Sequence, residues 1–238
     1  MPRQLPLVGA AALDFPLPIC YHSAAMSPPP RARIGTDESG KGDYFGYLVV
    51  AAVFVDQGTE APLGAIRVRD SKRVSDRSAA RLAAEIRRLC PHEVIRISPA
   101  KYNELHSKMG NLNHLLAWAH ARAIENLLER QPSRLVVSDQ FGDEAYLRSA
   151  LMAKGKQVEL VQMPRAEADV AVAAASILAR AAFLETLQRL SDEIGIPLPK
   201  GATHVIEAAK AVAAKGGRDL LGRVAKLHFK TTRQVLGG

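Results

Sequence analysis

The sequence predicts an α/β fold built on a mixed β-sheet. Three short apolar runs, residues 32–38, 46–55 and 65–69, have the length and composition of strands. From residue 75 onward, amphipathic helices alternate with further apolar runs, which is the pattern of a sheet covered by helices. Early strands joined by short turns and later strands separated by helices together indicate mixed pairing.

Capping residues mark where the helices begin. Ser75 is placed to cap one helix, and a second amphipathic helix spans residues 111–129. The histidines on this second helix, His114 and His120, are expected to be exposed or bonded to a partner. The remaining elements expected are strands at 94–97, 135–139 and 158–161 and an apolar helix at 170–190.

The chain is strongly basic. It carries a formal net charge of +8 over 238 residues, and its pI is near 9.7. Residues 200–233 hold eight Lys or Arg side chains against two acids, so most of the excess lies in that stretch. This distribution favours a polyanionic partner such as nucleic acid, although a solvated charged face would have the same composition.

Cysteine usage and hydropathy suggest a cellular location. Cys20 and Cys90 fit no metal-binding pattern and are expected to be free thiols in a reducing compartment. The longest apolar run, residues 170–184, is short for a membrane span and contains Arg180. Prolines interrupt any signal-peptide core near the amino terminus. We therefore expect a cytoplasmic protein that is not bound to a membrane.

The amino-terminal segment differs from the rest. Residues 1–30 are rich in proline and show neither helical nor strand periodicity, so we expect a flexible extension. Residues 31–238 are expected to form one domain that includes the basic carboxyl-terminal region.

Two adjacent carboxylates end the first predicted strand. Asp37 and Glu38 are followed at once by a small basic loop that contains Gly40, Lys41 and Gly42. Hard cations such as Mg²⁺ bind carboxylate oxygens together with substrate phosphates. Glycines allow backbone N–H groups to approach a phosphate or a sugar. The pattern favours phosphate chemistry, and it also fits a surface hairpin with solvated charges.

Further acids occur at the end of a strand and the start of a helix. Asp139 ends a buried strand, at the position where ligands gather in α/β sheets. Glu167 and Asp169 precede the apolar helix at 170–190. Either acid also fits a structural role at the positive end of the helix dipole.

Residues 37–46, Asp-Glu-Ser-Gly-Lys-Gly-Asp-Tyr-Phe-Gly, resemble the signature of ribonuclease HIII, a bacterial type 2 ribonuclease H. The sister branch, ribonuclease HII, usually has Asp-Glu-Ala-Gly-Arg-Gly, so Ser39 and Lys41 point to the HIII branch. Tyr47 departs from the pattern, because the family usually has proline there. The resemblance runs from about residue 31 to 236 and includes the stretches 70–72, 111–120, 138–141, 173–180 and 226–231.

The resemblance implies a ribonuclease H-like fold, with a mixed sheet flanked by helices and a basic helical carboxyl-terminal part. It implies an endonuclease that hydrolyses the RNA strand of RNA/DNA hybrids and leaves 5′-phosphate and 3′-hydroxyl ends. Two Mg²⁺ or Mn²⁺ ions about 4 Å apart would activate water and stabilise the leaving 3′ oxygen. The carboxylates implied as catalytic residues and metal ligands are Asp37, Glu38, Asp139 and Glu167, with Asp169 as the competitor of Glu167.

The resemblance also implies how substrate is held. The glycine loop would contact the 2′-hydroxyl groups that distinguish RNA from DNA. The expected partner is an RNA/DNA hybrid duplex, bound by a monomer that requires no other protein. The family commonly carries an amino-terminal domain similar to the TATA-binding-protein fold, and the segment before the signature is too short for one. The substrate contacts expected are Ser39, Gly40, Lys41, Gly42, Lys72 and Ser176.

Two alternatives remain open at this stage. One is ribonuclease HII-like cleavage at single ribonucleotides embedded in duplex DNA, against which Lys41 and a glutamate at the fourth acidic position argue. The other is a non-catalytic protein that binds RNA/DNA hybrids, against which the four acids argue.

Overall fold

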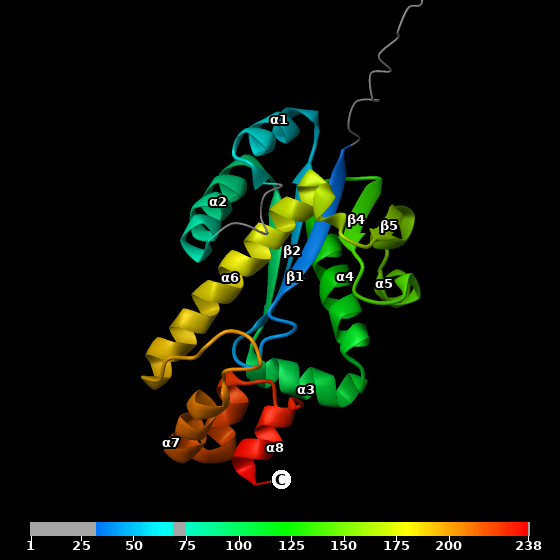
Figure 1. Ribbon diagram of the computed structural model, residues 1–238. Helices are drawn as coiled ribbons and strands as arrows, with labels where there is room; N and C mark the ends of the chain where they lie inside the picture. Colours follow the sequence, from blue (N-terminus) through cyan, green and yellow to red (C-terminus); the bar gives the residue numbers. More distant parts are fainter. Residues whose placement is uncertain (1–31, 69–74, 238) are drawn as a thin grey trace, which may run out of the picture.

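A five-stranded mixed sheet forms the centre of the molecule (Figure 1). The computed structural model describes residues 32–68 and 75–237. The strand order is β3-β2-β1-β4-β5, with β1–β2 and β2–β3 antiparallel and with β1–β4 and β4–β5 parallel. The strands are β1 (Arg33–Ser39), β2 (Leu48–Val55), β3 (His92–Ile97), β4 (Leu135–Asp139) and β5 (Glu159–Met163).

Helices cover both faces of the sheet (Figure 1). The long helix α6 crosses one face with α1 and α2 beside it, and α4 covers the other face with α5 beside it. Helices α3, α7 and α8 lie together beyond the end of β1 (Figure 1). The helices are α1 (Gln57–Ala65), α2 (Asp76–Leu89), α3 (Pro99–Met109), α4 (Leu112–Arg130), α5 (Glu144–Ala150), α6 (Val170–Ile194), α7 (Ile206–Val224) and α8 (Lys230–Leu236), with short 3₁₀ turns η2 (Gly155–Gln157) and η3 (Ala166–Ala168).

Strand β2 shows why the sheet is covered on both sides. All eight of its residues are buried. Val49 and Val53 belong to the core under α6, whereas Leu48 and Val50 belong to the core under α4. A continuous apolar run is typical of a strand that has helices on both faces, because alternate side chains point to opposite sides.

The predicted α/β fold with a mixed sheet is confirmed, and one predicted strand is wrong. The chain expected to form a strand at 65–69 instead completes α1 and turns, as far as residue 68. Asp56 and Thr59 form a capping box: the Thr59 N–H donates to Asp56 Oδ1 at 3.0 Å, and the Asp56 N–H donates to Thr59 Oγ1 at 2.9 Å. Two satisfied backbone donors favour a helix start here, and the helix accommodates Pro62 in its interior.

Other boundaries agree with local capping chemistry. Ser75 caps α2, as the sequence indicated, and Asn111 caps α4 at the expected start of the second helix. Helix α3 was not predicted, although Ser98 caps it and Pro99 occupies its first turn, which is a common helix start. The expected extension at residues 1–30 and the expected contact Lys72 lie outside the described residues.

Helix α6 is largely buried in the core on one face of the sheet. By length and composition it could cross a membrane, but 78% of its most apolar window is buried inside the fold. It packs directly on β1 at Gly35, where an added Cβ would lie 2.2 Å from the Ala171 carbonyl carbon and 2.2 Å from the Val172 nitrogen. Only glycine leaves room for the helix backbone at this crossing.

We expect Gly35→Ala to destabilise the fold, because the new methyl group would overlap the backbone of α6 rather than a movable side chain. The free energy of unfolding should fall by about 3 kcal/mol or more in urea titrations. Gly64→Ala is the matched control, since an added Cβ at Gly64 in α1 meets nothing within 4 Å. The control should stay within about 1 kcal/mol of wild type, and equal losses in the two variants would contradict the tight crossing.

Candidate active site

The acidic residues meet at the carboxyl ends of two parallel strands. Asp37 and Glu38 lie near the end of β1, and Asp139 ends the neighbouring strand β4. Thr36 is paired with Ser138 in the parallel register, so Asp37 and Asp139 each lie one residue further along at the same edge. The structure thus places three of the acids singled out from the sequence at the same end of the sheet.

The strand pleat separates the two adjacent carboxylates of β1. Asp37 points to the α6 face, where it has a hydrogen bond with the hydroxyl of Ser176. Glu38 points to the α4 face, where one of its oxygens lies 3.1 Å from Nε2 of His120. Successive residues of a regular strand face opposite sides of the sheet, so each carboxylate has a different helix as its support.

Asp37 is an unusually weak acid in this setting. Burial and the neighbouring negative charges of Glu38 and Asp139 raise the pKa of Asp37 to about 7. Hydrogen bonds from Ser176 and from the Glu38 N–H, the latter at 2.8 Å, act in the opposite direction and do not offset this increase. A nearby cation would remove the repulsion, which fits a site built to bind one.

Glu38 is held in its ionised form. Burial acts to raise its pKa, but the hydrogen bond and charge of His120, together with Lys41, lower the pKa below its usual value. Lys41 Nζ lies 3.3 Å from Glu38 Oε1. The adjacent carboxylates therefore have pKa values that are shifted in opposite directions.

His120 contacts one of the candidate acids, a contact that the sequence did not single out, although a bonded partner was one of the two expectations for this residue. Its side chain is fully buried, with Nδ1 at 2.8 Å from Thr36 Oγ1 and its ring stacked on Phe141 at 4.8 Å. Nε2 therefore faces Glu38 while Nδ1 faces the Thr36 hydroxyl, which can either donate or accept, so both ring nitrogens have a partner. His120 lies four residues after Leu116, which puts both side chains on the inward face of α4. This spacing is the feature of the sequence from which a buried role for His120 could have been predicted.

Asp139 is fixed by the turn that carries the fourth candidate acid. Its Oδ1 accepts a hydrogen bond of 2.9 Å from the Ala166 N–H, and Glu167 is the next residue in the chain. The Gln162 side-chain amide on β5 also reaches the Asp139 carbonyl oxygen, at 3.4 Å.

Asp169, the competing acid, is engaged elsewhere. Its Oδ1 caps α6 by accepting hydrogen bonds from the Ala171 and Val172 N–H groups at 2.8 and 3.4 Å. Its Oδ2 accepts a hydrogen bond of 2.6 Å from Nε of Arg33 at the opposite end of β1 from the other acids. Both oxygens therefore have structural partners.

The glycine loop has one constrained residue and one open residue. Gly40 has φ of +87°, and an added Cβ would lie 2.1 Å from the Tyr47 carbonyl oxygen. Gly42 is exposed, and an added Cβ there would meet nothing within 4 Å. The loop is thus packed against the protein at Gly40 and open to an approaching ligand at Gly42.

The donor chemistry of the site fits a hard divalent cation. Asp37, Glu38, Asp139 and Glu167 offer only oxygen ligands, which Mg²⁺ and Mn²⁺ prefer. Among the residues that the structure describes, no three acidic, His or Cys side chains are already gathered at coordinating distance. This is consistent with carboxylates that repel one another and accept hydrogen bonds from Ser176, His120 and the Ala166 N–H instead.

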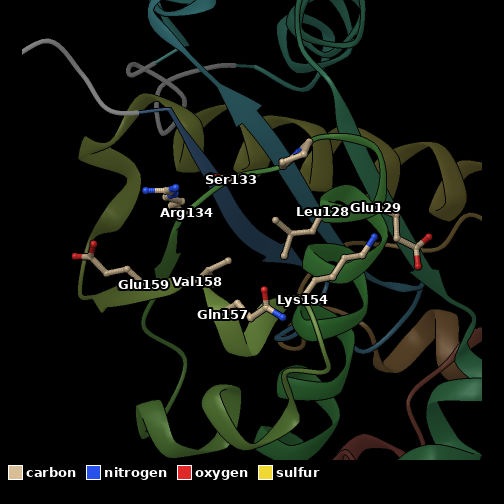
Figure 2. A pocket seen from close by; sticks show the side chains of 9 residues that line it. Leu128, Glu129, Ser133, Arg134, Lys154, Gln157, Val158 and Glu159 are labelled. Atoms are coloured by element: carbon tan, nitrogen blue, oxygen red, sulfur yellow. The ribbon is translucent and has the colours of Figure 1, made fainter.

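A separate cleft lies at the other end of the strands. It has a volume of about 620 Å³ and is lined by residues from the end of α4, the loop before β4, and the segment from just before η2 to the start of β5 (Figure 2). Arg134, Lys154, Glu129 and Glu159 give it charges of both signs. None of the predicted site residues lines it, so it is not the site described above.

Comparison with known proteins gives the family. The family model described as Ribonuclease HII matches residues 34–232. The chain belongs to the ribonuclease HII/HIII family. A curated ribonuclease HIII of Protochlamydia amoebophila is 48% identical over 206 residues, which cover 86% of this chain and 68% of the relative. The ribonuclease HIII of Chlamydia pneumoniae is 46% identical over 212 residues, which cover 87% of this chain and 71% of the relative.

The solved structures agree. The crystal structure of Bst ribonuclease HIII in complex with Mn²⁺ matches with a TM-score of 0.81 and 34% identity, over 88% of this chain and 70% of that one. The ribonuclease H-like fold predicted from the signature is therefore confirmed, as is the family resemblance. By family, this ribonuclease H is a metal-dependent endoribonuclease, and family membership implies cleavage of the RNA strand in RNA/DNA hybrids.

The raised pKa of Asp37 predicts a pH dependence of stability in the metal-free protein. Between about pH 4 and pH 7, the folded state holds a proton on Asp37 that the unfolded chain has lost. The unfolded state then binds fewer protons, so the free energy of unfolding falls as pH rises through this range. From pH 4 to pH 7, the free energy of unfolding of the wild type should fall by on the order of 2–4 kcal/mol more than that of Asp37→Asn. Urea titrations in EDTA at each pH measure this difference.

A divalent ion supplies the control for this pH effect. Adding Mg²⁺ or Mn²⁺ at pH 7 should restore stability to the wild type and much less to Asp37→Asn, because the ion binds the folded state. Parallel stability curves for the two proteins from pH 4 to 7 would show that Asp37 has an ordinary pKa.

Proposed function

We propose that this ribonuclease H hydrolyses the RNA strand of RNA/DNA hybrids with two divalent metal ions and leaves 5′-phosphate and 3′-hydroxyl ends. The observation that carries the proposal is the meeting of Asp37, Glu38 and Asp139 beside a loop with an exposed glycine, Gly42. Family membership supports the substrate class.

The proposed ligands are four carboxylates, with Glu167 rather than Asp169 as the fourth. Glu167 follows the residue whose N–H contacts Asp139, whereas Asp169 is held by Arg33 and by the start of α6. When bound, two Mg²⁺ or Mn²⁺ ions would activate the attacking water and stabilise the leaving 3′ oxygen. The Mn²⁺ complex of Bst ribonuclease HIII supports a divalent cation in this family.

The protein's own side chains orient the carboxylates and hold the duplex. His120 and Ser176 fix the directions of Glu38 and Asp37. Lys41 and the backbone of residues 39–42 contact ribose hydroxyls and phosphate, and the basic carboxyl-terminal part neutralises the duplex backbone. The proposed enzyme acts as a monomer in the cytoplasm.

The decisive experiment is cleavage of two labelled duplexes in Mg²⁺ and in Mn²⁺. One is an RNA/DNA hybrid, and the other is DNA with one embedded ribonucleotide. The hybrid should be cut to fragments with 5′-phosphate ends. Asp139→Asn should lose at least about a thousandfold in cleavage rate while it binds the hybrid within a few fold of wild type, because it lacks only a metal ligand.

The other outcomes separate the alternatives. Efficient cleavage beside the lone ribonucleotide would indicate ribonuclease HII-like activity, the branch named by the matching family model. Tight hybrid binding without cleavage of either duplex would indicate a binding protein. Wild-type cleavage by Asp139→Asn would show that the assigned site is wrong.

The position of His120 predicts an effect on metal binding. His120→Leu removes the donor that orients Glu38, so Mn²⁺ affinity measured by calorimetry should fall by about 10–100-fold. His120→Gln should recover part of this loss, because its side-chain amide can donate to Glu38. His114→Leu on the same helix is the control, since His114 is exposed and should bind Mn²⁺ as wild type does. Equal affinities in the two leucine variants would contradict a positioning role.

A further inference from the structure

One lysine of the basic carboxyl-terminal part is fully buried. Lys226 has no exposed surface, and its Nζ donates hydrogen bonds of 2.8 Å to the carbonyl oxygens of both Asp43 and Gly46. The same Nζ lies 5.6 Å from the centre of the Tyr102 ring. Burying an ammonium group is unfavourable unless its hydrogen bonds are satisfied, so this arrangement needs an explanation.

The backbone around Lys226 holds the same loop. The Lys226 N–H donates to the Tyr44 carbonyl oxygen at 2.9 Å, and the Gly46 N–H donates to the Val224 carbonyl oxygen at 2.9 Å. Phe45 and Ala225 form the antiparallel bridge between these two bonds. Residues 224–226 and 44–46 therefore form a short ladder, which the Lys226 side chain extends.

A second connection ties the loop to residue 201. Gly201 donates its N–H to Asp43 Oδ1 at 2.6 Å, and the Tyr44 N–H donates to the Gly201 carbonyl oxygen at 2.9 Å. The Tyr44 hydroxyl reaches Thr232 Oγ1 at 3.1 Å. Every one of these partners comes from the carboxyl-terminal part of the chain.

Helix α3 fixes the lysine from its other side. The Asn103 side chain donates to the carbonyl oxygens of Gly222 and Ala225 at 3.2 and 2.9 Å, and it accepts a hydrogen bond of 2.9 Å from the Leu227 N–H. The residues before and after Lys226 are thus held by one amide, which leaves the lysine little freedom.

The loop consequently has an anchored half and a substrate-facing half. Residues 43–46 are bound to the carboxyl-terminal part through Lys226, whereas Gly42 is open to solvent. The two halves are continuous, so any shift of the anchored carbonyl oxygens moves Lys41 and Gly42 relative to the carboxylates.

We infer that Lys226 is a positioning residue that sets the place of the glycine loop beside the carboxylates and thereby its hold on the ribose of the substrate. This inference rests on the proposed function. Lys226 does not touch the substrate, because its ammonium is enclosed by loop carbonyls and Tyr102. It acts through the loop that does.

The test uses Lys226→Met, which keeps a long unbranched side chain, one atom shorter, and removes its donors. The KM for an RNA/DNA hybrid should rise by about tenfold to a hundredfold, because a misplaced loop loses its ribose contacts. Mn²⁺ affinity should stay within twofold, since the carboxylates keep Ser176 and His120. Lys156→Met removes the same charge from an exposed site on η2 and should leave KM unchanged.

Amide hydrogen exchange in the free protein tests the same inference without any activity. Exchange in residues 39–46 should become at least about tenfold faster in Lys226→Met, while exchange in β1 and β4 stays as in wild type. If the wild type does not cut the hybrid, the proposed function is wrong. The exchange measurement still tests whether Lys226 holds the glycine loop in place. Unchanged amide exchange in residues 39–46 of Lys226→Met would overturn the inference. Faster exchange in these residues with an unchanged KM would also overturn it.

Asn103→Ala keeps the inference testable if Lys226→Met does not fold. It loosens the backbone on both sides of Lys226 without disturbing the lysine side chain itself. A smaller change in the same direction, in both loop exchange and KM, is expected. Wild-type values for both loop exchange and KM in Asn103→Ala would contradict the positioning role of Lys226.

Discussion

The parallel pairing of β1 with β4 is the constraint on which the candidate site depends. It brings Asp37 and Asp139 to one edge of the sheet, and the pleat of β1 sends Glu38 to the opposite face. A carboxylate on each face needs its own support, which α6 supplies through Ser176 and α4 supplies through His120. The site therefore requires both helical layers and not only the strand that carries the signature.

Carboxylates that lie close together repel one another. The surrounding residues compensate this repulsion for Glu38 and much less for Asp37. Glu38 is compensated by His120 and Lys41, so its pKa is lowered despite burial. Asp37 has only hydrogen-bond support, and burial with neighbouring acids raises its pKa to about 7. A bound cation removes this repulsion, which links ligand binding to the stability of the fold.

The basic carboxyl-terminal part is both a surface and a structural support. Composition alone counts eight basic side chains in residues 200–233 as candidates for contact with nucleic acid. Lys226 is not one of them, because it is buried against loop carbonyl oxygens. Lys200 and Lys210 are paired with Asp76 and Glu207. Charge counting thus indicates the class of partner and overstates the number of free cations.

The sequence by itself determined the family, the mixed α/β sheet and the acids that end its strands. Strand periodicity, helix caps and the run at residues 37–42 are local patterns, and local patterns can be read without coordinates. Only the tertiary structure revealed that His120 contacts Glu38 and that Lys226 binds the carbonyl oxygens of the glycine loop. It also showed that Asp169 is paired with Arg33. These contacts join residues far apart in the chain, 82 positions apart for Glu38 and His120, and no local pattern encodes them. Buried polar groups find partners through packing, and packing is decided by the whole fold.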